Sequence, residues 1–367
     1  MSFLEKIVIQ DFRNIELQEL SFSPNVNCIS GGNGEGKTNL LDAIWYMSMT
    51  KSAFAQSDTH NFRKGCSSFA ISGLYRMDNG LQSRFSIGVG ASGKQIRRDE
   101  RLYERISEHI GILPIVMVSP ADTALISESG EQRRRFANSV ISQMDAGYLS
   151  AVQNYNRILM QRNRALKDAA ADSGLLESFD LMLARDGAVI DGKRAEFARR
   201  LTPLVQKYYG RISGDREEVS IRYRSDLDRG PLEELLRDSR ERDLVMHYTC
   251  TGVQRDEFVF TMNGMPLRQC GSQGQQKSFL VAVKFAQYEI LRDSHDHPPM
   301  LLLDDLFDKL DMERVANLLE MVAGNDFGQI FITDSNKVRI KGILDRITAE
   351  SRFYEAKGGA YAALDGD

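Results

Sequence analysis

The chain has 367 residues, of which 42% are hydrophobic and 27% are charged, proportions typical of a globular protein with room for two domains. The formal net charge of −4 excludes an overall attraction for nucleic acid, so DNA binding would need a local basic patch. There is no apolar run of about 18 residues, as a membrane-spanning helix needs, and residues 1–6 lack the layout of a secretory signal. We therefore expect a cytoplasmic protein that needs no membrane.

The cysteines give no sign of a disulfide framework or a zinc site. They are scattered along the chain, without C-x-x-C spacing and without a nearby cluster of histidines, at Cys28, Cys66, Cys250 and Cys270. We expect them to be small core residues.

The N-terminal third is predicted to form mostly strands. Residues 7–14, 17–22 and 26–30 are rich in β-forming residues. Two further alternating runs flank Asp78-Asn79-Gly80, whose residues tolerate the positive φ of a hairpin turn. This pattern predicts an antiparallel β flap.

A phosphate-binding loop lies between the third of these runs and a helical pattern. Its sequence fits G-x4-G-K-[S/T], in which glycines let backbone N–H groups wrap a polyphosphate. The residues expected to bind ATP are Gly31, Gly32, Asn33, Gly34, Glu35, Gly36, Lys37 and Thr38. Lys37 would contact the β- and γ-phosphates as a catalytic cation, and Thr38 would bind Mg²⁺. A glycine-rich surface turn is the alternative, but the flanking strand and helix disfavour it.

The middle of the chain has the periodicity of helices. Phe136, Val140 and Met144 form one apolar stripe, and two similar stripes follow before Tyr209. Because Gly147, Ser173-Gly174 and Pro203 interrupt the pattern, we expect helices of about 20 residues in a compact lobe or short arm, not a long coiled coil.

A second hairpin, turning at Asn263-Gly264, precedes the last third of the chain. There the buried-strand run Met300-Leu301-Leu302-Leu303 ends in two carboxylates, Asp304 and Asp305. Asp304 would hold Mg²⁺ through water opposite Thr38, and Asp305 would orient or deprotonate the attacking water. Two aspartates that merely cap a strand or a following helix are the alternative.

Another anion-binding helix end is predicted just before that strand. Gly271-Ser272-Gln273-Gly274-Gln275 precedes a run whose apolar residues recur at helical spacing: Phe279, Val283, Ala286 and Ile290. The first loop is already expected to hold one triphosphate. Ser272, Gly274 and Gln275 are therefore expected to bind the γ-phosphate held by another copy of the chain.

These motifs, in this order, resemble the ATP-binding-cassette head of SMC-like DNA repair ATPases, and within that class the RecF family. Further matching segments are Phe12-Arg13-Asn14, Ser119-Pro120, Arg133-Arg134-Arg135-Phe136, Tyr155-Asn156-Arg157, Gln161-Arg162-Asn163, Arg255-Asp256 and Phe331-Ile332-Thr333. The resemblance implies an α/β ATPase head, with a mixed sheet, phosphate loop and antiparallel β flap, plus a mainly helical lobe or arm. The head would comprise residues 1–125 and 251–367, and the lobe residues 126–250.

The resemblance also implies a function. The chain would be an ATP-dependent DNA-binding protein of recombinational repair and replication restart, acting at single-strand gaps and on duplex with RecO and RecR as partners. It would form a head-to-head homodimer around two ATP molecules, with Asp311 at the seam, and would hydrolyse ATP slowly when DNA stimulates it.

Three stretches depart from the family pattern. Residues 51–55 read Lys-Ser-Ala-Phe-Ala, without the usual arginine. Residues 252–257 read Gly-Val-Gln-Arg-Asp-Glu and lack the usual proline and histidine. Asp334 and Ser335 stand where transporter cassettes carry a switch histidine, which favours the repair class.

Two alternatives stay open. The nucleotide-binding subunit of a membrane transporter shares these parts, although its signature usually begins Leu-Ser-Gly-Gly. An ATP-binding clamp with negligible hydrolysis would have the same motifs.

A sequence-independent grip on the DNA backbone is expected, because aromatic residues do not interleave with the basic ones. The basic candidates are Lys51, Arg63 and Lys64 after the first helix, Lys94, Arg97 and Arg98 on the flap, and Arg133, Arg134, Arg135, Arg162, Arg164 and Lys167 on the lobe.

Overall fold

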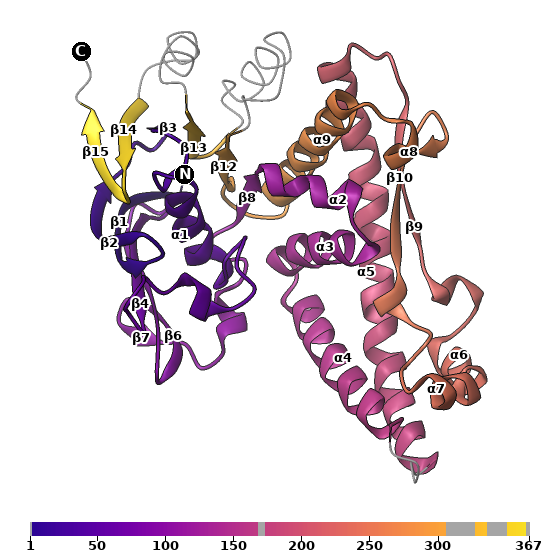
Figure 1. The fold of residues 1–367 in the computed structure, drawn as a ribbon. Coiled ribbons are helices and arrows are strands. Elements are labelled where there is room, and N and C mark those ends of the chain that lie inside the picture. Colours follow the sequence, from indigo (N-terminus) through magenta and orange to yellow (C-terminus); the bar gives the residue numbers. More distant parts are fainter. Residues whose placement is uncertain (1, 168–172, 306–326, 336–350, 365–367) are drawn as a thin grey trace. The chain divides into compact units, whose positions relative to one another are not determined.

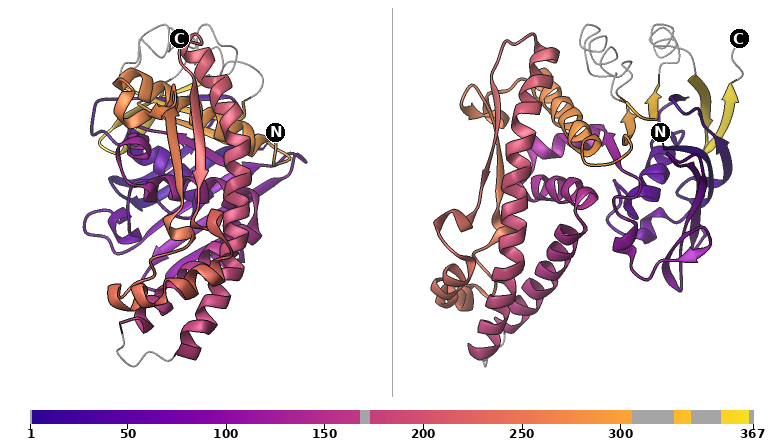
Figure 2. Two further views of the ribbon diagram at one scale, coloured as in Figure 1. Left: turned by 90° about the vertical axis from the view of Figure 1, so that its right-hand side faces the viewer. Right: turned by 180° about the vertical axis from the view of Figure 1, so that it is seen from behind.

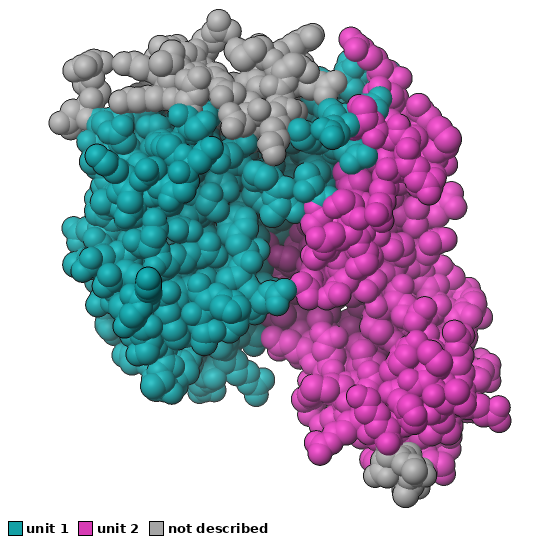
Figure 3. Space-filling model, viewed as in Figure 1, with its two compact units in different colours: residues 1–123, 208–215, 273–367 teal, residues 124–207, 216–272 magenta. Residues whose placement is uncertain are grey.

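The computed structural model describes residues 2–167, 173–305, 327–335 and 351–364. The chain divides into two compact units (Figure 3). Unit 1 comprises Met1–Thr123, Tyr208–Asp215 and Gln273–Asp367, and unit 2 comprises Ala124–Lys207 and Arg216–Ser272. Figure 1 labels the helices and strands.

One sheet of unit 1 is antiparallel and contains the flap, with strand order β2-β1-β4-β5-β6-β7. Its strands are β1 (Phe3–Phe12), β2 (Ile15–Ser21), β4 (Phe69–Arg76), β5 (Gln82–Gly90), β6 (Gly93–Arg98) and β7 (Arg101–Leu102). The β4–β5 hairpin turns where expected, and Gly80 has the positive φ (79°) that its turn requires.

The other sheet of unit 1 is mainly parallel, with strand order β15-β14-β3-β13-β12-β8. Its strands are β3 (Val26–Ser30), β8 (Ile115–Val118), β12 (Met300–Asp304), β13 (Ile330–Asp334), β14 (Ser351–Lys357) and β15 (Ala360–Leu364), and only β15 runs antiparallel to its neighbour. Strands β3, β8, β12 and β13 are buried along their whole length, as parallel strands covered on both faces are. The parallel register brings the carboxyl ends of β3, β12 and β13 to one edge of this sheet.

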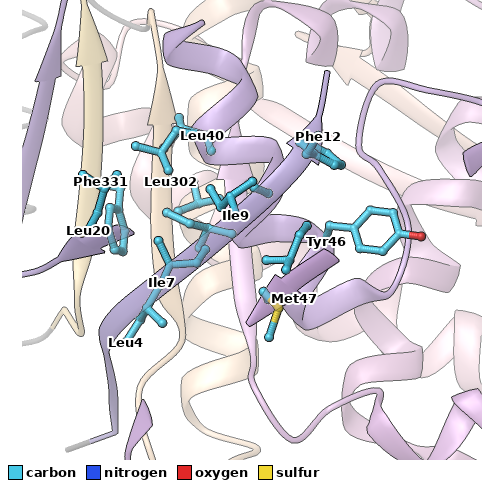
Figure 4. Close-up of a cluster of buried hydrophobic side chains, with 14 of the residues drawn as sticks. Leu4, Ile7, Ile9, Phe12, Leu20, Leu40, Tyr46, Met47, Leu302 and Phe331 are labelled. Carbon is cyan, nitrogen blue, oxygen red and sulfur yellow. The ribbon is translucent and has the colours of Figure 1, made fainter. Parts of the chain in front are cut away.

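Helix α1 (Lys37–Met49) packs between the two sheets of unit 1. Figure 4 shows the resulting core: Ile7 and Ile9 of β1 meet Leu40 and Met47 of α1, with Leu302 of β12 behind them. Because both ends of α1 are fixed in this core, the residues just before it have a rigid support.

Unit 2 is mainly helical. It contains α2 (Ala124–Ser127), α3 (Gly130–Met144), α4 (Ala146–Ala165), most of α5 (Ser173–Ser213), α6 (Leu232–Asp238), α7 (Arg240–Met246) and α8 (Leu267–Cys270). A three-stranded sheet, β11-β10-β9, completes it, formed by β9 (Val219–Arg224), β10 (Glu257–Met262) and β11 (Met265–Pro266). The predicted second hairpin is present, with positive φ at Asn263 (48°) and Gly264 (77°).

Helices α4 and α5 form an antiparallel hairpin (Figures 1 and 2). Arg194 Nε donates to Tyr148 Oη at 3.2 Å near the base, and Arg162 Nε donates to Asp180 Oδ1 at 2.7 Å near the far end. Between them the backbone of Gly187 lies close to other side chains. A Cβ there would lie 2.6 Å from a methyl group of Leu232. This hairpin is the arm that the helical periodicity predicts.

The predicted length of about 20 residues is confirmed for α4 but wrong for α5, which has 41 residues and continues through Pro203. Buried Leu176, Leu183, Ile190 and Phe197 recur every seven residues along it, so one apolar stripe is covered throughout. Proline costs the helix one backbone hydrogen bond. Packing along the whole stripe offsets that cost. The predicted break at Ser173 is instead the first residue of α5.

The boundaries of the units also differ from the predicted ones. Because β10 pairs with β9, residues 251–272 belong with the helices of unit 2 and not with the head. The last turns of α5, from Tyr208, belong to unit 1, where Tyr208 Oη donates to Glu289 of α9 (Gln273–Arg292) at 2.6 Å.

Candidate nucleotide-binding site

The phosphate-binding loop connects the end of β3 to the start of α1 at the carboxyl edge of the parallel sheet. Gly34 and Gly36 have φ angles of 84° and 108°, which L-residues with a Cβ rarely adopt. A Cβ on Gly36 would also lie 2.8 Å from Nδ2 of Asn14. Glycine is therefore required at Gly36 for the backbone conformation and for space.

The turn between β14 and β15 supports this loop from the other side. Tyr361 Oη donates to the carbonyl of Gly36 at 2.7 Å, and the amide of Gly359 donates to the carbonyl of Glu35 at 2.9 Å. The amide of Gly358 donates to the Glu35 carboxylate. These contacts could not be predicted from local sequence patterns, because more than 300 residues separate the partners.

Lys37 lies inside the loop and not in solvent. Its side-chain ammonium donates to the carbonyls of Gly31 (2.9 Å) and Gly32 (3.0 Å), and only 4% of the residue is exposed. A buried ammonium beside backbone carbonyls, in a loop that precedes a helix N-terminus, is suited to an anionic ligand.

Thr38 and Asp304 meet directly at the edge of the sheet. The Thr38 hydroxyl lies 3.0 Å from each carboxylate oxygen of Asp304, and the Thr333 hydroxyl donates to Asp304 Oδ1 at 2.7 Å. Burial raises the pKa of Asp304, while hydrogen bonds from Thr333 and Thr38 oppose that rise. A hard cation prefers oxygen ligands and would stabilise a carboxylate that burial disfavours. The residues present therefore fit a Mg²⁺ ion.

Asp305 lies one residue beyond, in a left-handed conformation with φ 43°. Its amide donates to Thr333 Oγ1 at 3.0 Å, which fixes the backbone. Its Oδ1 is buried and has no hydrogen-bond partner among the residues that the structure describes. A buried carboxylate oxygen without a partner fits the predicted role of a group that orients or deprotonates water.

Arg13 links the β1–β2 turn to the first helix. Its guanidinium lies 2.7 Å from Asp42 Oδ2 and donates to Asn39 Oδ1 and Ser52 Oγ, each at 3.0 Å. Asp42 is fully buried, and burial raises its pKa while Arg13 lowers it. Phe12-Arg13-Asn14 was one of the segments that match the family pattern, but no physical role for it could be predicted. The structure indicates that Arg13 holds the helix that starts at the phosphate loop.

The signature residues lie at the start of α9. Ser272 is exposed, whereas Gly274 and Gln275 are half-buried in the first turn. The predicted apolar positions of this helix, Phe279 and Val283 among them, are buried. That the signature acts on a second copy stays a prediction, and Asp311 lies outside the described residues.

Lys284 of the same helix forms an ion pair with Asp122 (2.6 Å), which follows β8 in η3 (Pro120–Thr123). Both residues belong to unit 1. The pair therefore ties α9 to the parallel sheet.

Several basic residues proposed for DNA contact have other partners. Arg162 is fully buried and pairs with Asp180 and Asp243, so its assignment is wrong. Arg133 Nε donates to Glu257 at 2.7 Å, and Lys94 is 2.9 Å from a carboxylate oxygen of Asp58.

Arg134 is partly buried and donates to the carbonyl of Asp256 at 2.8 Å. The basic candidates that remain exposed are Lys51, Lys64, Arg97, Arg135, Arg164 and Lys167.

The cysteines are free thiols, and Cys28 and Cys250 are buried as expected, while Cys66 and Cys270 are half-buried. Within the described ranges, no three potential metal-binding side chains of His, Cys, Asp or Glu come together. Among the helices of the same ranges, none combines the length and the apolar character that crossing a bilayer requires.

Comparison with known proteins agrees with this geometry. A family model described as an AAA domain matches residues 6–178. The DNA replication and repair protein RecF of Bacteroides fragilis is 41% identical over 364 residues, covering 99% of this chain and 98% of its own length. RecF of Phocaeicola vulgatus is 42% identical over 359 residues, covering 97% of each chain.

Solved structures show the same relationship. The recombination mediator protein RecF with ATP, described as part of the RecFOR pathway, has a TM-score of 0.89 at 29% identity, covering 99% of this chain and 98% of that one. The Smc head domain of Pyrococcus furiosus has a TM-score of 0.58 at 15% identity, covering 99% and 96%, and shows the fold alone. The predicted ATPase head with a helical arm is thereby confirmed, and the chain belongs to the RecF family of DNA replication and repair proteins.

Proposed function

We propose that this chain is an ATP-dependent DNA-binding protein of recombinational DNA repair and replication restart, working in the cytoplasm at single-strand gaps. The observation that carries the proposal is the contact of Thr38 with both carboxylate oxygens of Asp304, beside the buried ammonium of Lys37. These three groups and the glycine loop are the parts that a Mg²⁺–triphosphate site requires.

In this proposal the loop backbone and Lys37 bind the phosphates of ATP, and Thr38 and Asp304 hold Mg²⁺. The ion would neutralise phosphate charge when bound. The chain's own residues supply the remaining chemistry. Asp305 accepts a proton from water or orients it, and Thr333 fixes both aspartates by hydrogen bonds to Asp304 Oδ1 and the Asp305 amide.

A second copy of the chain would complete the site by contributing Ser272, Gly274 and Gln275. Within one copy the signature and the phosphate loop lie on different elements: the signature begins α9, which packs on β8 and η3, and the phosphate loop precedes α1. A ligand that binds only the assembled form stabilises it by RT ln(1 + [L]/Kd), about 2.7 kcal/mol at a hundredfold excess over Kd. Two ATP molecules per homodimer would double this stabilisation of the dimer.

DNA binding would follow from assembly, because the exposed basic side chains of two copies could line one groove that a single copy lacks. RecO and RecR, the other proteins of the pathway named for the RecF structure, would be the partners. Such binding would weaken with salt in proportion to the number of phosphates contacted.

The test is binding of a fluorescent ATP analogue, followed by binding of gapped DNA with and without ATP. Lys37→Ala should lower nucleotide affinity by about tenfold or more and remove the ATP effect on DNA binding. Lys6→Ala is the matched control, because Lys6 is a half-exposed lysine of the same unit that forms an ion pair with Glu19 at 2.6 Å, away from the phosphate loop in sequence. Equal nucleotide binding by both variants, or DNA binding that ATP does not alter, would contradict the proposal.

A further inference from the structure

The phosphate loop contains one acidic side chain as well as its lysine. Within residues 31–38, Glu35 stands two residues before Lys37, in a loop proposed to bind a triphosphate. A carboxylate so close to the phosphates opposes them, and it also competes with them for the ammonium of Lys37. Binding of ATP therefore requires that this carboxylate be kept away from the phosphates.

The turn between β14 and β15 holds that carboxylate. The amide of Gly358 donates to Glu35 Oε2, and the amide of Gly359 donates to the backbone carbonyl of Glu35 at 2.9 Å. The ammonium of Lys37 donates to two carbonyls at the start of the loop instead. The carboxylate of the loop thus bonds to the turn and not to the ammonium.

Other contacts within unit 1 fix the position of this turn. Tyr361 of β15 is 5% exposed, and its hydroxyl donates to the carbonyl of Gly36 at 2.7 Å. The amide of Tyr361 donates to Oε1 of Gln18 on β2 at 2.6 Å. Gly359 lies against the backbone of Asn14, in the turn between β1 and β2. These contacts hold the β14–β15 turn in place, so its two amides meet the phosphate loop as a fixed pair.

We propose that the β14–β15 turn controls the affinity for nucleotide by holding the Glu35 carboxylate away from the phosphates. This inference rests on the proposed binding of ATP at the loop, and it adds the turn to that site. Gly358 and Gly359 are positioning residues, because they act through Glu35 and not on the phosphates themselves. Displacement of the turn frees the carboxylate to approach the phosphates or Lys37, and either contact weakens the binding of ATP.

A purely structural role for the turn is the alternative. In that case the turn supports the loop backbone, and its loss weakens ATP binding whether or not residue 35 is charged. If the turn acts on the charge, removing the charge makes the turn much less important for binding. Glu35→Gln separates the two roles, because glutamine keeps an oxygen that accepts from Gly358 and lacks the charge.

The test measures the binding of a fluorescent ATP analogue by the full chain. Gly359→Ala displaces the turn, because its Cβ would lie 2.8 Å from the carbonyl carbon of Asn14 and closer still to the carbonyl oxygen. We expect binding to weaken by about tenfold, and by less at high salt, which screens the charge. Gly93→Ala is the matched control and should leave binding unchanged. Gly93 has nearly the same φ (86° against 87°) in the β5–β6 turn of unit 1, where a Cβ would have no neighbour within 4 Å.

The same substitution is then made in Glu35→Gln, which completes a double-mutant cycle. In that background Gly359→Ala should weaken binding by only about threefold or less. An equal loss in both backgrounds would overturn the proposal and leave the turn a structural role. A wild-type chain that binds no ATP analogue would overturn the proposed function itself, and this proposal with it.

A second variant covers the case in which Gly359→Ala fails to fold. Glu35→Asp keeps the charge of the wild type but is one methylene shorter, so its carboxylate falls short of the Gly358 amide. It should bind the ATP analogue about fivefold more weakly than the wild type, and Glu35→Gln should bind more tightly than Glu35→Asp. The loss in Glu35→Asp should be smaller for an ADP analogue, which carries less charge. Equal binding by Glu35→Asp and the wild type would contradict the proposal, as would equal losses in the aspartate and glutamine variants.

Discussion

Replacing Arg13 by methionine should destabilise unit 1 strongly and in a pH-dependent way. The substitution keeps the length of the side chain but removes the charge that lies 2.7 Å from the fully buried carboxylate of Asp42. Leaving one member of a buried ion pair without its partner costs about 3–5 kcal/mol. With a urea dependence of about 3 kcal/mol per molar, the unfolding midpoint would fall by roughly 1 to 1.7 M.

The sign of the pH dependence follows from Asp42. Burial already raises its pKa, and Arg13 is the principal group that lowers it, so the variant should have a still higher pKa for Asp42 in the folded state. A raised folded-state pKa means that folding takes up a proton, so the stability of the variant relative to wild type recovers as pH falls. Asp42→Asn added to Arg13→Met should recover part of the loss at pH 7.

The assay is urea unfolding followed by the fluorescence of Trp45, the sole tryptophan, which lies in α1 three residues after Asp42. Arg63→Met is the control, because its pair with Asp11 is partly exposed to solvent, so breaking it should cost much less stability. If both variants lose the same stability, or if the loss in Arg13→Met does not depend on pH, the role assigned to the Arg13–Asp42 pair is wrong.

Three further predictions concern other groups. Asp305→Asn should slow DNA-stimulated phosphate release by about a hundredfold or more while ATP still binds, and unchanged release in a phosphate assay would show that another group activates water. Ser272→Arg should prevent the rise in mass that ATP causes in light scattering, so an equal rise in the variant would count against a shared site. His109 is fully buried, its Nε2 lies 2.6 Å from the carbonyl of Met47, and burial lowers its pKa. Because the unfolded chain then binds more protons, the thermal midpoint should fall as pH drops below about 6.5. His109→Gln should reduce this pH dependence. If the thermal midpoints of both proteins change with pH in the same way between about pH 5 and 7.5, this prediction is wrong.

The phosphate loop was predictable because its glycines meet a local requirement. Gly36 needs a positive φ, and Lys37 and Thr38 follow it at fixed spacing. The strand ending at Asp304 was predictable because an unbroken apolar run indicates a buried parallel strand. In both cases the signal lies within ten residues of the group that it concerns.

The contacts that support the loop were not predictable from the sequence. Tyr361 and Gly36 are 325 residues apart, and nothing local to Tyr361 indicates a hydrogen bond. The prediction that Arg162 contacts DNA failed for a related reason. An arginine in a basic helix suggests a solvated face, and its partners Asp180 and Asp243 are distant in the sequence. Pro203 misled because its local cost to a helix is real, while the packing that offsets it is spread along the whole of α5.

The proposal that two copies share each nucleotide can be tested most directly by mixing two variants. Lys37→Ala has a damaged loop and an intact signature, and Ser272→Arg has the reverse. Each alone should fail to release phosphate with DNA, whereas a mixed dimer contains one complete site. An equimolar mixture should therefore recover activity, to at most about a quarter of the wild-type rate if the copies pair at random. A mixture as inactive as its separate components, or an active Ser272→Arg protein on its own, would contradict the account.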